Sequence, residues 1–373
     1  MSTPTKPWLS TLALAEQAIG LSDPNPRVGC LIVSADGQRV LGQGHTQAAG
    51  GPHAEVMALR DAAAHGADVR GATVYVTLEP CAHHGRTPPC CDALVAAGVG
   101  RVEIALGDPN PLVNGQGTAR IAAAGIAVGH APPAVALRAR ELNIGFFSRM
   151  ERARPWVRMK IAASLDGRTA LPDGTSQWIT GADARADGHA FRRRAGALLT
   201  GIGTVLADDP SLDVRLVPTA RQPLRCVVDA RLDTPPAARL FDGESAVILF
   251  TAAHDTARRA ALEARGAEIV QVPARADGRV DLDAVLADLA RRQINELHVE
   301  AGARLNGALL DGGHVDELLL YLAPTLLGAG RAMATLAPLH ALADGLAFEF
   351  HDATRTGTDL RILARKAGSN SPR

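Results

Sequence analysis

The chain has 373 residues, 47% of them hydrophobic, and its 39 lysines and arginines balance 39 aspartates and glutamates. This length exceeds one ordinary core and suits two domains. With no net positive charge and only 3% aromatic residues, the composition excludes a surface that binds nucleic acid through phosphate attraction and base stacking.

The N-terminus and the cysteine content indicate a cytoplasmic protein. Residues 1–20 lack the basic-then-apolar pattern of a signal peptide, and no apolar run is long enough to span a membrane. Five cysteines, an odd number in a long chain, do not suit a disulfide framework. We therefore expect a reducing compartment, no membrane partner, and clustered cysteines that serve metal binding or catalysis.

In the first part of the chain, patterns typical of strands and helices alternate. Two strands are expected around the turn Asp36-Gly37, and a helix that ends at Gly66 follows. The predicted elements are strands within 27–45, a helix at 53–66, a strand at 71–79, a helix at 91–100 and a strand at 101–106. This alternation predicts an α/β domain with a partly parallel sheet.

A domain boundary is predicted at about 146–154, where a helical pattern turns basic and meets Pro155. We therefore expect two α/β domains, at residues 1–150 and 151–373, each with its own sheet. Helical patterns, for example at 282–292, separate several of the strands predicted in the second domain. These strands are 157–163, 197–201, 224–229, 246–251, 269–272, 297–300 and 317–322.

The segment LEPCAHHGRTPPCCD, at residues 78–92, contains three of the five cysteines. A catalytic zinc ion keeps three nitrogen or sulfur ligands and leaves its fourth position to water, which then loses a proton near neutral pH. His53, Cys81 and Cys90 would supply one nitrogen and two sulfurs, and we predict that they bind zinc. Two alternatives stay open: a closed structural zinc with Cys91 or His83 as fourth ligand, or no metal. Cys91 is expected to face the helix interior.

Glu55 is the expected general acid and base. Residues two apart in a helix point about 200° apart, so His53 and Glu55 reach one point only if both lie at the start of a helix. The preceding Gly50-Gly51-Pro52 suits such a start. A carboxylate beside the zinc can move a proton from water to a leaving amine, as in deaminases with H-x-E followed by P-C and a second cysteine.

These motifs resemble the bifunctional deaminase/reductase family of riboflavin biosynthesis. The deaminase half carries NPRVG at 25–29, GQGH at 42–45, GPHAE at 51–55 and PCAHHGRTPPC at 80–90. The reductase half carries KIAASLDGRTA at 160–170, SQWIT at 176–180, TVLADDPSLDVR at 204–215 and VEAGARLNGALL at 299–310. The resemblance covers nearly the whole chain, and its motifs are long and specific.

The resemblance implies two consecutive reactions on small-molecule substrates. The first domain would hydrolyse the 2-amino group of 2,5-diamino-6-(5-phosphoribosylamino)pyrimidin-4-one. The second would use NADPH to reduce the ribose of 5-amino-6-(5-phosphoribosylamino)uracil to a ribityl chain. It also implies a cytidine-deaminase-like first domain, a dihydrofolate-reductase-like second domain, one zinc ion per chain and a homo-oligomer, either a dimer or a tetramer.

Individual roles follow from the same resemblance. In the deaminase half, Asn25 and His45 would hold the pyrimidine and Arg86 a phosphate; the alternative for Arg86 is a solvated loop charge. The implied cofactor contacts are Ala162, Trp178, Thr204, Asp208 and a loop of Gly302, Ala303, Arg304, Leu305, Asn306, Gly307 and Ala308. The implied substrate contacts are Ser176, Arg192, Leu212, Arg215 and Glu300. We expect Asp208 to be the catalytic polar group near the hydride acceptor.

One position departs from the family. Ala230 follows Asp229 where the family often has a small hydroxyl residue against the ribose phosphate of the cofactor, so the 2′-phosphate contact would fall to Arg231 or to the backbone.

Two rival functions are considered. One is a zinc deaminase of free or nucleic-acid bases, which the C-x8-C spacing and the whole second half oppose. The other is a non-catalytic regulator with a structural zinc, which Glu55 opposes because a closed site has no use for a general base.

Overall fold

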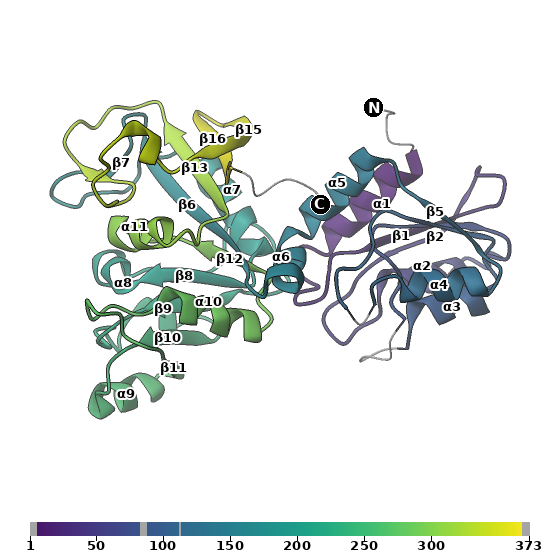
Figure 1. Cartoon of the computed structure of the whole chain (residues 1–373), viewed down its shortest axis with the longest axis horizontal. Coiled ribbons are helices and arrows are strands. Elements are labelled where there is room, and N and C mark those ends of the chain that lie inside the picture. Colours follow the sequence, from purple (N-terminus) through teal and green to yellow (C-terminus); the bar gives the residue numbers. More distant parts are fainter. Residues whose placement is uncertain (1–5, 83–87, 112, 368–373) are drawn as a thin grey trace. The chain divides into compact units, whose positions relative to one another are not determined.

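A computed structural model of the chain describes residues 6–82, 88–111 and 113–367. It divides into two compact units, Met1–Ala153 and Arg154–Arg373, and each has its own sheet and its own core (Figure 1). The expected α/β class is confirmed for both. None of the helices in the described ranges is long and apolar enough to cross a membrane.

The first unit is a five-stranded sheet between two groups of helices (Figure 1). Its strands, in the order β2-β1-β3-β4-β5, are β2 (Val40–His45), β1 (Gly29–Val33), β3 (Thr73–Val76), β4 (Arg101–Ile104) and β5 (Ala127–His130). One group comprises α2 (Ala54–Ala64), α3 (Cys90–Ala96) and α4 (Gln116–Ala123). On the other side lie α1 (Lys6–Gln17) and α5 (Pro133–Leu142), and α6 (Ile144–Arg152) follows α5.

Two glycines allow the helices to pack directly on the strands. A Cβ atom on Gly29 would lie 2.1 Å from the carbonyl oxygen of Thr11 in α1, and one on Gly42 would lie 2.2 Å from that of Ala58 in α2. Any side chain at either position would push the helix away from the sheet.

Strand directions bring several chain segments to one edge of this sheet. β1 is antiparallel to both neighbours, with Gly29 paired to His45 and Cys30 paired to Val76. The start of β1 therefore lies beside the ends of β2 and β3. β4 runs parallel to β3 and ends at the same edge, so the segments that enter β1 and leave β2, β3 and β4 meet there.

The second unit is a nine-stranded mixed sheet in the order β11-β10-β9-β8-β12-β6-β13-β16-β15. All neighbours from β11 to β13 are parallel, whereas β13, β16 and β15 pair antiparallel. The strands are β6 (Trp156–Ser164), β8 (Ala197–Gly201), β9 (Leu224–Val228), β10 (Val247–Thr251), β11 (Ala267–Gln271), β12 (Glu296–Val299), β13 (Glu317–Ala323), β15 (Phe348–Thr356) and β16 (Asp359–Lys366). The seven predicted strands are confirmed.

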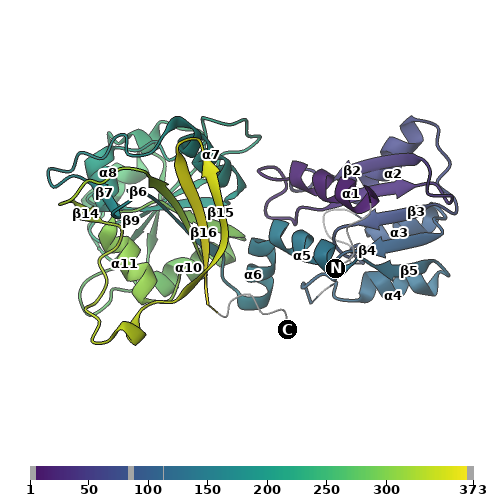
Figure 2. The ribbon, with the colours of Figure 1, turned by 90° about the horizontal axis from the view of Figure 1, so that it is seen from above.

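Helices and short elements complete this unit. The helices are α7 (Ala182–Arg194), α8 (Ile202–Asp208), α9 (Thr256–Glu263), α10 (Leu282–Arg291) and α11 (Ala303–Asp311), with short helical turns at Arg239–Phe241 and Leu342–Asp344. A two-stranded sheet joins β7 (Arg168–Ala170) to β14 (Arg331–Ala332). Neither this small sheet nor the hairpin β15–β16, which Figure 2 shows at the edge of the large sheet, was predicted from the sequence.

The two faces of the large sheet differ in chemistry. Met159 of β6 packs in the main apolar core with side chains of α10 and α11. On the other face, under α7, Arg158 is ion-paired with Glu296 at 2.6 Å and with Glu317, and all three side chains are at most 3% exposed. Arg194 of α7 also binds Glu296, and Arg365 of β16 binds Glu317. Because each buried carboxylate meets two arginines, these charges tie α7, β6, β12, β13 and β16 together.

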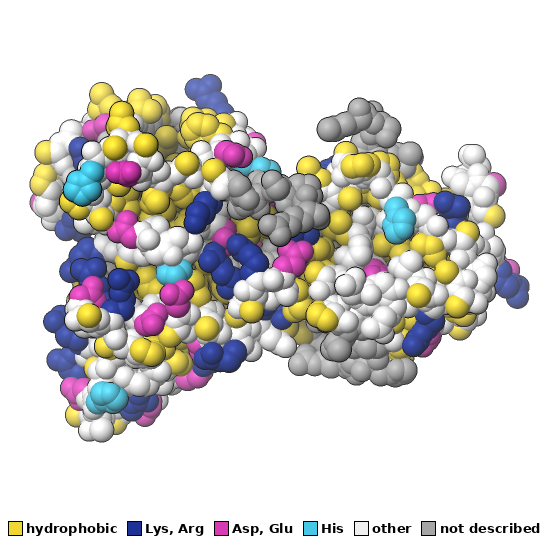
Figure 3. Space-filling view, in the orientation of Figure 1, with side chains coloured by type: hydrophobic (Ala, Val, Ile, Leu, Met, Phe, Trp, Pro, Cys, Tyr) yellow, Lys and Arg dark blue, Asp and Glu magenta, His cyan; other side chains and the backbone are white. Residues whose placement is uncertain are grey.

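The charges on the molecular surface are mixed in sign. On the face drawn in Figure 3, lysine and arginine side chains are interspersed with acidic and hydrophobic ones in both units. This mixture agrees with the balance of 39 basic and 39 acidic residues. A face of this kind does not provide the continuous positive field that attracts a nucleic-acid backbone.

Candidate active sites

His53, Cys81 and Cys90 come together at the edge of the first sheet where β1 begins. His53 precedes α2 as its N-cap residue, Cys81 follows β3, and Cys90 begins α3. Their ligand atoms all lie within 4.8 Å of one another. His53 Nδ1 is 3.6 Å from Cys81 Sγ and 3.4 Å from Cys90 Sγ. Donors on tetrahedral zinc, at bond lengths of about 2.0–2.3 Å, would be roughly 3.5–3.8 Å apart, so the group fits zinc.

The two thiols have opposite acidities in the absence of a cation. A hydrogen bond from the Cys90 thiol lowers the pKa of Cys81 to about 4, and the same hydrogen bond, with burial, raises the pKa of Cys90. The pKa of His53 is raised, chiefly by its hydrogen bond with Cys81. One thiolate is therefore already favoured, and a divalent cation would stabilise the second.

Glu55 lies in the first turn of α2, as expected, and is only 3% exposed. Burial, together with the negative charge of Cys81, raises the pKa of Glu55 to about 7. Its carboxyl group also interacts with the Cys90 thiol. A carboxyl group with this pKa both gives and takes a proton near neutral pH, whereas a cation bound by the cysteines would favour its ionised form.

Three other predicted deaminase residues have different outcomes. Asn25 precedes β1 and His45 ends β2, so both lie at the edge of the sheet that carries the metal group. Burial lowers the pKa of His45, which favours its neutral form. Arg86 lies outside the described residues, as does His83. Cys91 is fully buried in the core of this unit, and its Sγ is 3.6 Å from Asp92 Oδ1.

Two buried carboxyl groups near Cys81 were not predicted from the sequence. Glu79 accepts hydrogen bonds from the backbone N–H of Gly115 and Thr118, both at 3.0 Å, and from that of Asp108 at 3.3 Å. It thus fixes the loop after β4 against the Cys81 segment. Burial raises the pKa of Asp108 to about 6. The sequence signal that could have found this loop is the turn-forming run DPNP at 108–111.

The predicted cofactor residues of the second unit gather where parallel strands end. Ligands in such sheets bind beyond the carboxyl ends of the strands. Ala162 is near the end of β6, Thr204 lies in the helix after β8, and Gly302 lies between β12 and α11. A Cβ atom on Gly302 would be 3.9 Å from Thr204 Oγ1, so the starts of α8 and α11 adjoin. The first turn of α11 has no side-chain cap, and this arrangement fits a cofactor phosphate.

The segment Gly302–Ala308, which the resemblance assigns as the cofactor-binding loop, follows β12 and lies mostly in a helix. Helix α11 begins at Ala303 and runs to Asp311, because the backbone continues helically through Asn306 and Gly307. The Asn306 side chain donates to the carbonyl oxygen of Met333 at 2.9 Å, and a Cβ atom on Gly307 would lie 1.8 Å from the carbonyl oxygen of Thr335. These two residues therefore hold the segment 333–335 against the helix.

Glu300, directly after β12, is the centre of a charged cluster. Arg192 binds it in bidentate fashion, with Nε–Oε1 at 2.5 Å and Nη2–Oε2 at 2.8 Å. Lys160 Nζ is 3.9 Å from Oε2, and His298 Nε2 is 3.2 Å from Oε1. Burial opposes ionisation, yet Arg192 and Lys160 hold the pKa of Glu300 well below its usual value. Lys160, which was not predicted from the sequence, has a pKa lowered by burial.

The two arginines expected to contact substrate phosphate are both paired with protein groups. Arg192 also donates through Nη1 to the carbonyl oxygen of Asp213 at 2.7 Å, so all three of its nitrogens are engaged. Arg215 pairs with the Asp213 carboxylate, and its backbone N–H donates to His189 Nδ1 at 3.1 Å. The residue Asp213 thus links Arg192, Arg215 and Glu300 into one region.

The remaining predicted reductase residues range from exposed to buried. Trp178 is 66% exposed, with the Arg185 guanidinium 4.5 Å from its ring centre. Ser176 is half-buried, whereas Leu212 is buried with φ +49°. Asp208 ends α8, and partial burial of its carboxyl group raises its pKa against the opposing charge of Arg331.

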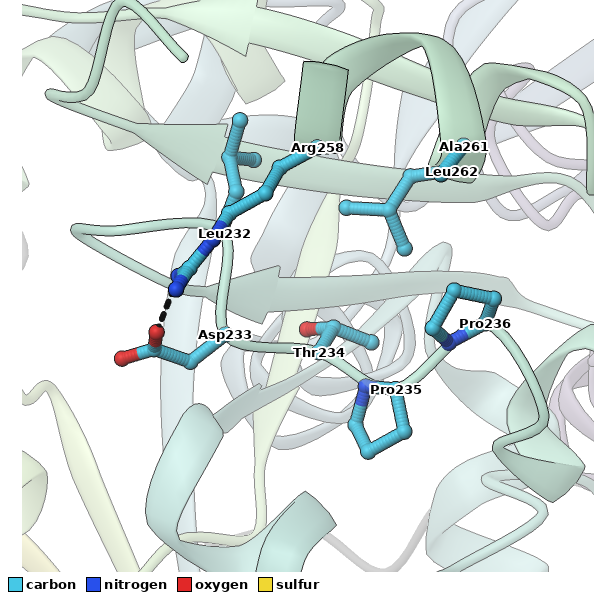
Figure 4. A pocket seen from close by; sticks show the side chains of 8 residues that line it. All are labelled: Leu232, Asp233, Thr234, Pro235, Pro236, Arg258, Ala261 and Leu262. Atoms are coloured by element: carbon cyan, nitrogen blue, oxygen red, sulfur yellow. Dashed lines mark hydrogen bonds and ion pairs between the residues drawn. The ribbon is translucent and has the colours of Figure 1, made fainter.

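A shallow pocket lies between the chain after β9 and helix α9 (Figure 4). It is lined by Leu232, Asp233, Thr234, Pro235, Pro236, Arg258, Ala261 and Leu262. Arg258 reaches across it to the Asp233 carboxylate, which also binds Arg231 at 3.0 Å. Arg231 is therefore not a free cation, and its contact with a 2′-phosphate stays a prediction.

Family models match both units. Residues 5–106 match the cytidine and deoxycytidylate deaminase zinc-binding region, and residues 155–362, more than half of the chain, match the RibD C-terminal domain. The riboflavin biosynthesis protein RibD of Escherichia coli is 45% identical over 364 residues, which are 94% of this chain and 95% of that protein. The RibD protein of Aquifex aeolicus is 37% identical over 95% of this chain and 96% of its own length.

Solved structures of similar proteins point to the same family as the sequence comparisons. Acinetobacter baumannii RibD, form 1, is 39% identical, with a TM-score of 0.86 over 96% of this chain and 97% of that chain. A diaminohydroxyphosphoribosylaminopyrimidine deaminase/5-amino-6-(5-phosphoribosylamino)uracil reductase from Thermotoga maritima is 31% identical, with a TM-score of 0.85 over the same shares. The resemblance of the motifs is thereby confirmed. The chain belongs to the RibD family of riboflavin biosynthesis proteins and is a bifunctional enzyme, both a deaminase and a reductase.

Proposed function

We propose that residues 1–150 hydrolyse the 2-amino group of 2,5-diamino-6-(5-phosphoribosylamino)pyrimidin-4-one. Residues 151–373 would then reduce the ribose of the product, 5-amino-6-(5-phosphoribosylamino)uracil, with NADPH. The observation that carries this proposal is the His53–Cys81–Cys90 group with the buried Glu55 beside it. The charged cluster around Glu300 and the similarity to the Thermotoga maritima deaminase/reductase support the second activity.

In the deaminase half, His53, Cys81 and Cys90 would hold one zinc ion per chain. When bound, the ion supplies hydroxide at neutral pH. Glu55 moves protons: it protonates the ring nitrogen beside the attacked carbon and then the departing ammonia. Asn25 and His45, at the same edge of the sheet, orient the pyrimidine, and burial of Glu55 keeps its carboxyl group away from bulk solvent.

In the reductase half, the first turns of α8 and α11 would hold the phosphates of NADPH, which supplies the hydride. Reduction of the opened ribose also requires a proton. We propose two candidate groups for it: Asp208, whose pKa is raised, and Lys160, whose pKa is lowered and whose Nζ is 3.9 Å from Glu300. Arg192 orients Glu300, and Arg215, beside Asp213, remains the more exposed cation for the substrate phosphate.

We also propose that the chain forms a homo-oligomer through the edge of its second sheet. β15 is the last strand of that sheet, and Phe350 on it is 80% exposed. An edge strand that carries an exposed aromatic side chain can pair with another chain. Light scattering on the purified protein should give a mass of two or four chains, and a monomer would contradict the proposal.

The two activities should respond differently to metal removal. Treatment of the full-length protein with a zinc chelator should abolish ammonia release from the diaminopyrimidine phosphate. NADPH oxidation with the deaminated substrate should continue, because the metal group and the Glu300 cluster belong to separate units. Adding zinc back should restore ammonia release. If NADPH oxidation falls in proportion to the zinc content, the proposal that the two units act independently is wrong.

A further inference from the structure

We propose that Asn143, at the junction of α5 and α6, is a positioning residue for deamination: it holds the loop of residues 22–28, which carries Asn25. This inference rests on the proposed function, because it assigns Asn25 to the pyrimidine. Asn143 is 116 positions from its main partner, Arg27, and it lies outside the 5–106 region that matches the zinc-deaminase model. No zinc ligand or general base comes from α5 or α6.

The side-chain amide of Asn143 forms hydrogen bonds with both backbone groups of Arg27. Its Oδ1 accepts the backbone N–H of Arg27 at 2.7 Å, and its Nδ2 donates to the carbonyl oxygen of Arg27 at 2.9 Å. Nδ2 also donates to the carbonyl oxygen of Ala139 in α5 at 3.3 Å. Asn143 is only 3% exposed. A buried amide paired to both backbone groups of one residue sets the position and the orientation of that residue.

Further hydrogen bonds join the loop to the two helices, some donated by the loop and some donated by a helix. The Arg27 side chain, 4% exposed, donates through Nη1 to the carbonyl oxygen of Leu142 at 2.9 Å. Its Nη2 lies 3.5 Å from Asp23 Oδ2, within the loop. Arg149 of α6 donates to the carbonyl oxygen of Pro24 at 3.3 Å. Residues on both sides of Asn25 are thus tied to α5 and α6.

The other side of the loop meets the deaminase site. The backbone N–H of Val28 donates to Thr46 Oγ1 at 3.2 Å, and the Thr46 N–H donates to the carbonyl oxygen of Val28 at 3.0 Å. The Gly29 N–H donates to Thr77 Oγ1 at 3.1 Å. Thr46 follows His45, and Thr77 leads toward Cys81. The loop is therefore hydrogen-bonded on one side to the junction of α5 and α6 and on the other side to the segments that follow β2 and β3.

This placement predicts an effect on substrate binding rather than on the metal. The metal group is held by α2, α3 and the chain after β3, none of which contacts Asn143 in the described hydrogen bonds. Loss of the hydrogen bonds between Asn143 and Arg27 should let the loop of residues 22–28 move while the zinc ligands stay in place. The KM for the diaminopyrimidine phosphate should rise, and kcat should change less.

The test is the full-length Asn143→Ala variant. We expect about one zinc per chain, as in the wild type, and a KM for deamination raised by about tenfold or more, since the two buried hydrogen bonds to Arg27 are lost. The kcat should fall by less than about threefold. NADPH oxidation with the deaminated substrate, measured on the same sample, should be unchanged. Asn143→Asp, which keeps the acceptor for the Arg27 N–H and loses the donor, should give an intermediate KM.

Arg140→Ala is the matched control. It removes the ion pair between Arg140 of α5 and Glu151 of α6, 2.7 Å long, without touching the loop, and should leave the KM at the wild-type value. If Asn143→Ala folds poorly, Arg149→Met removes the donor to Pro24, together with the cation–π contact with Phe146, leaves Asn143 in place and should still raise the KM. An unchanged KM in variants with full zinc content overturns the inference, and so does a joint fall in zinc, kcat and reductase activity. Absence of deamination in the wild type would instead overturn the proposed function.

Discussion

Replacing Cys90 with serine is expected to remove both the bound zinc and the deaminase activity, whereas replacing Cys91 with serine should leave both in place. Cys90 Sγ is 3.4 Å from His53 Nδ1, within the group of three ligand atoms. Cys91 is the adjacent residue in α3, but its side chain lies in the apolar core. Serine offers no thiolate, and a tetrahedral site with two remaining protein ligands holds zinc weakly.

The measurement is metal content per chain by mass spectrometry, paired with ammonia release. The two variants are matched controls for each other, since each exchanges one sulfur for one oxygen in the same helical turn. NADPH oxidation with the deaminated substrate should stay at the wild-type rate in both and so reports that the second unit is intact. A metal-free Cys91→Ser variant beside a zinc-loaded Cys90→Ser variant would reverse the ligand assignment.

The Glu55→Gln variant should keep its zinc and lose deamination by a factor of at least about 10², the lower end of the usual contribution of general acid–base catalysis. Glutamine has nearly the same size and can still form hydrogen bonds, but it cannot transfer a proton. Because Glu55 is buried with a pKa of about 7, the wild type has a proton donor and acceptor at neutral pH that the variant lacks.

The decisive readout is kcat for ammonia release at equal zinc content. Removing the buried carboxyl group also removes an unfavourable buried charge, so the thermal stability of the variant should be equal to or above that of the wild type. Wild-type turnover in a zinc-loaded Glu55→Gln protein would exclude Glu55 from the mechanism. A loss of zinc together with turnover would instead indicate that Glu55 supports the metal ligands.

The metal group was predictable from the sequence because its spacing has a local physical meaning. Gly50-Gly51-Pro52 directly precede the start of a helix, so His53 falls at its N-cap and Glu55 in its first turn. Pro80-Cys81 follow a short β-branched strand, and Cys90 begins the next helix. The large sheet was predictable for a similar reason: strands buried on both faces appear as short apolar runs between turn residues.

The edge hairpin β15–β16 was missed because its first strand is mostly exposed and shows no clean apolar alternation. The segment at 302–308 was expected to follow a strand and open a helix, and glycine usually weakens a helix interior. Gly307 is instead required inside α11 by the close approach of the Thr335 carbonyl oxygen, a contact between residues 28 positions apart that no local pattern reveals.

The sequence by itself therefore predicted two α/β domains and brought His53, Glu55, Cys81 and Cys90 together as one candidate site, because local hydrophobic periodicity and short spacings encode them. Only the tertiary structure decided which groups complete the sites. Arg192, Lys160 and His298 surround Glu300 from three different elements, and Asn143 holds Arg27 from 116 positions away. Burial is the reason for these contacts: a charged or amide group that loses contact with water is stable only if another group of the fold forms a hydrogen bond or ion pair with it. That group can lie anywhere in the sequence.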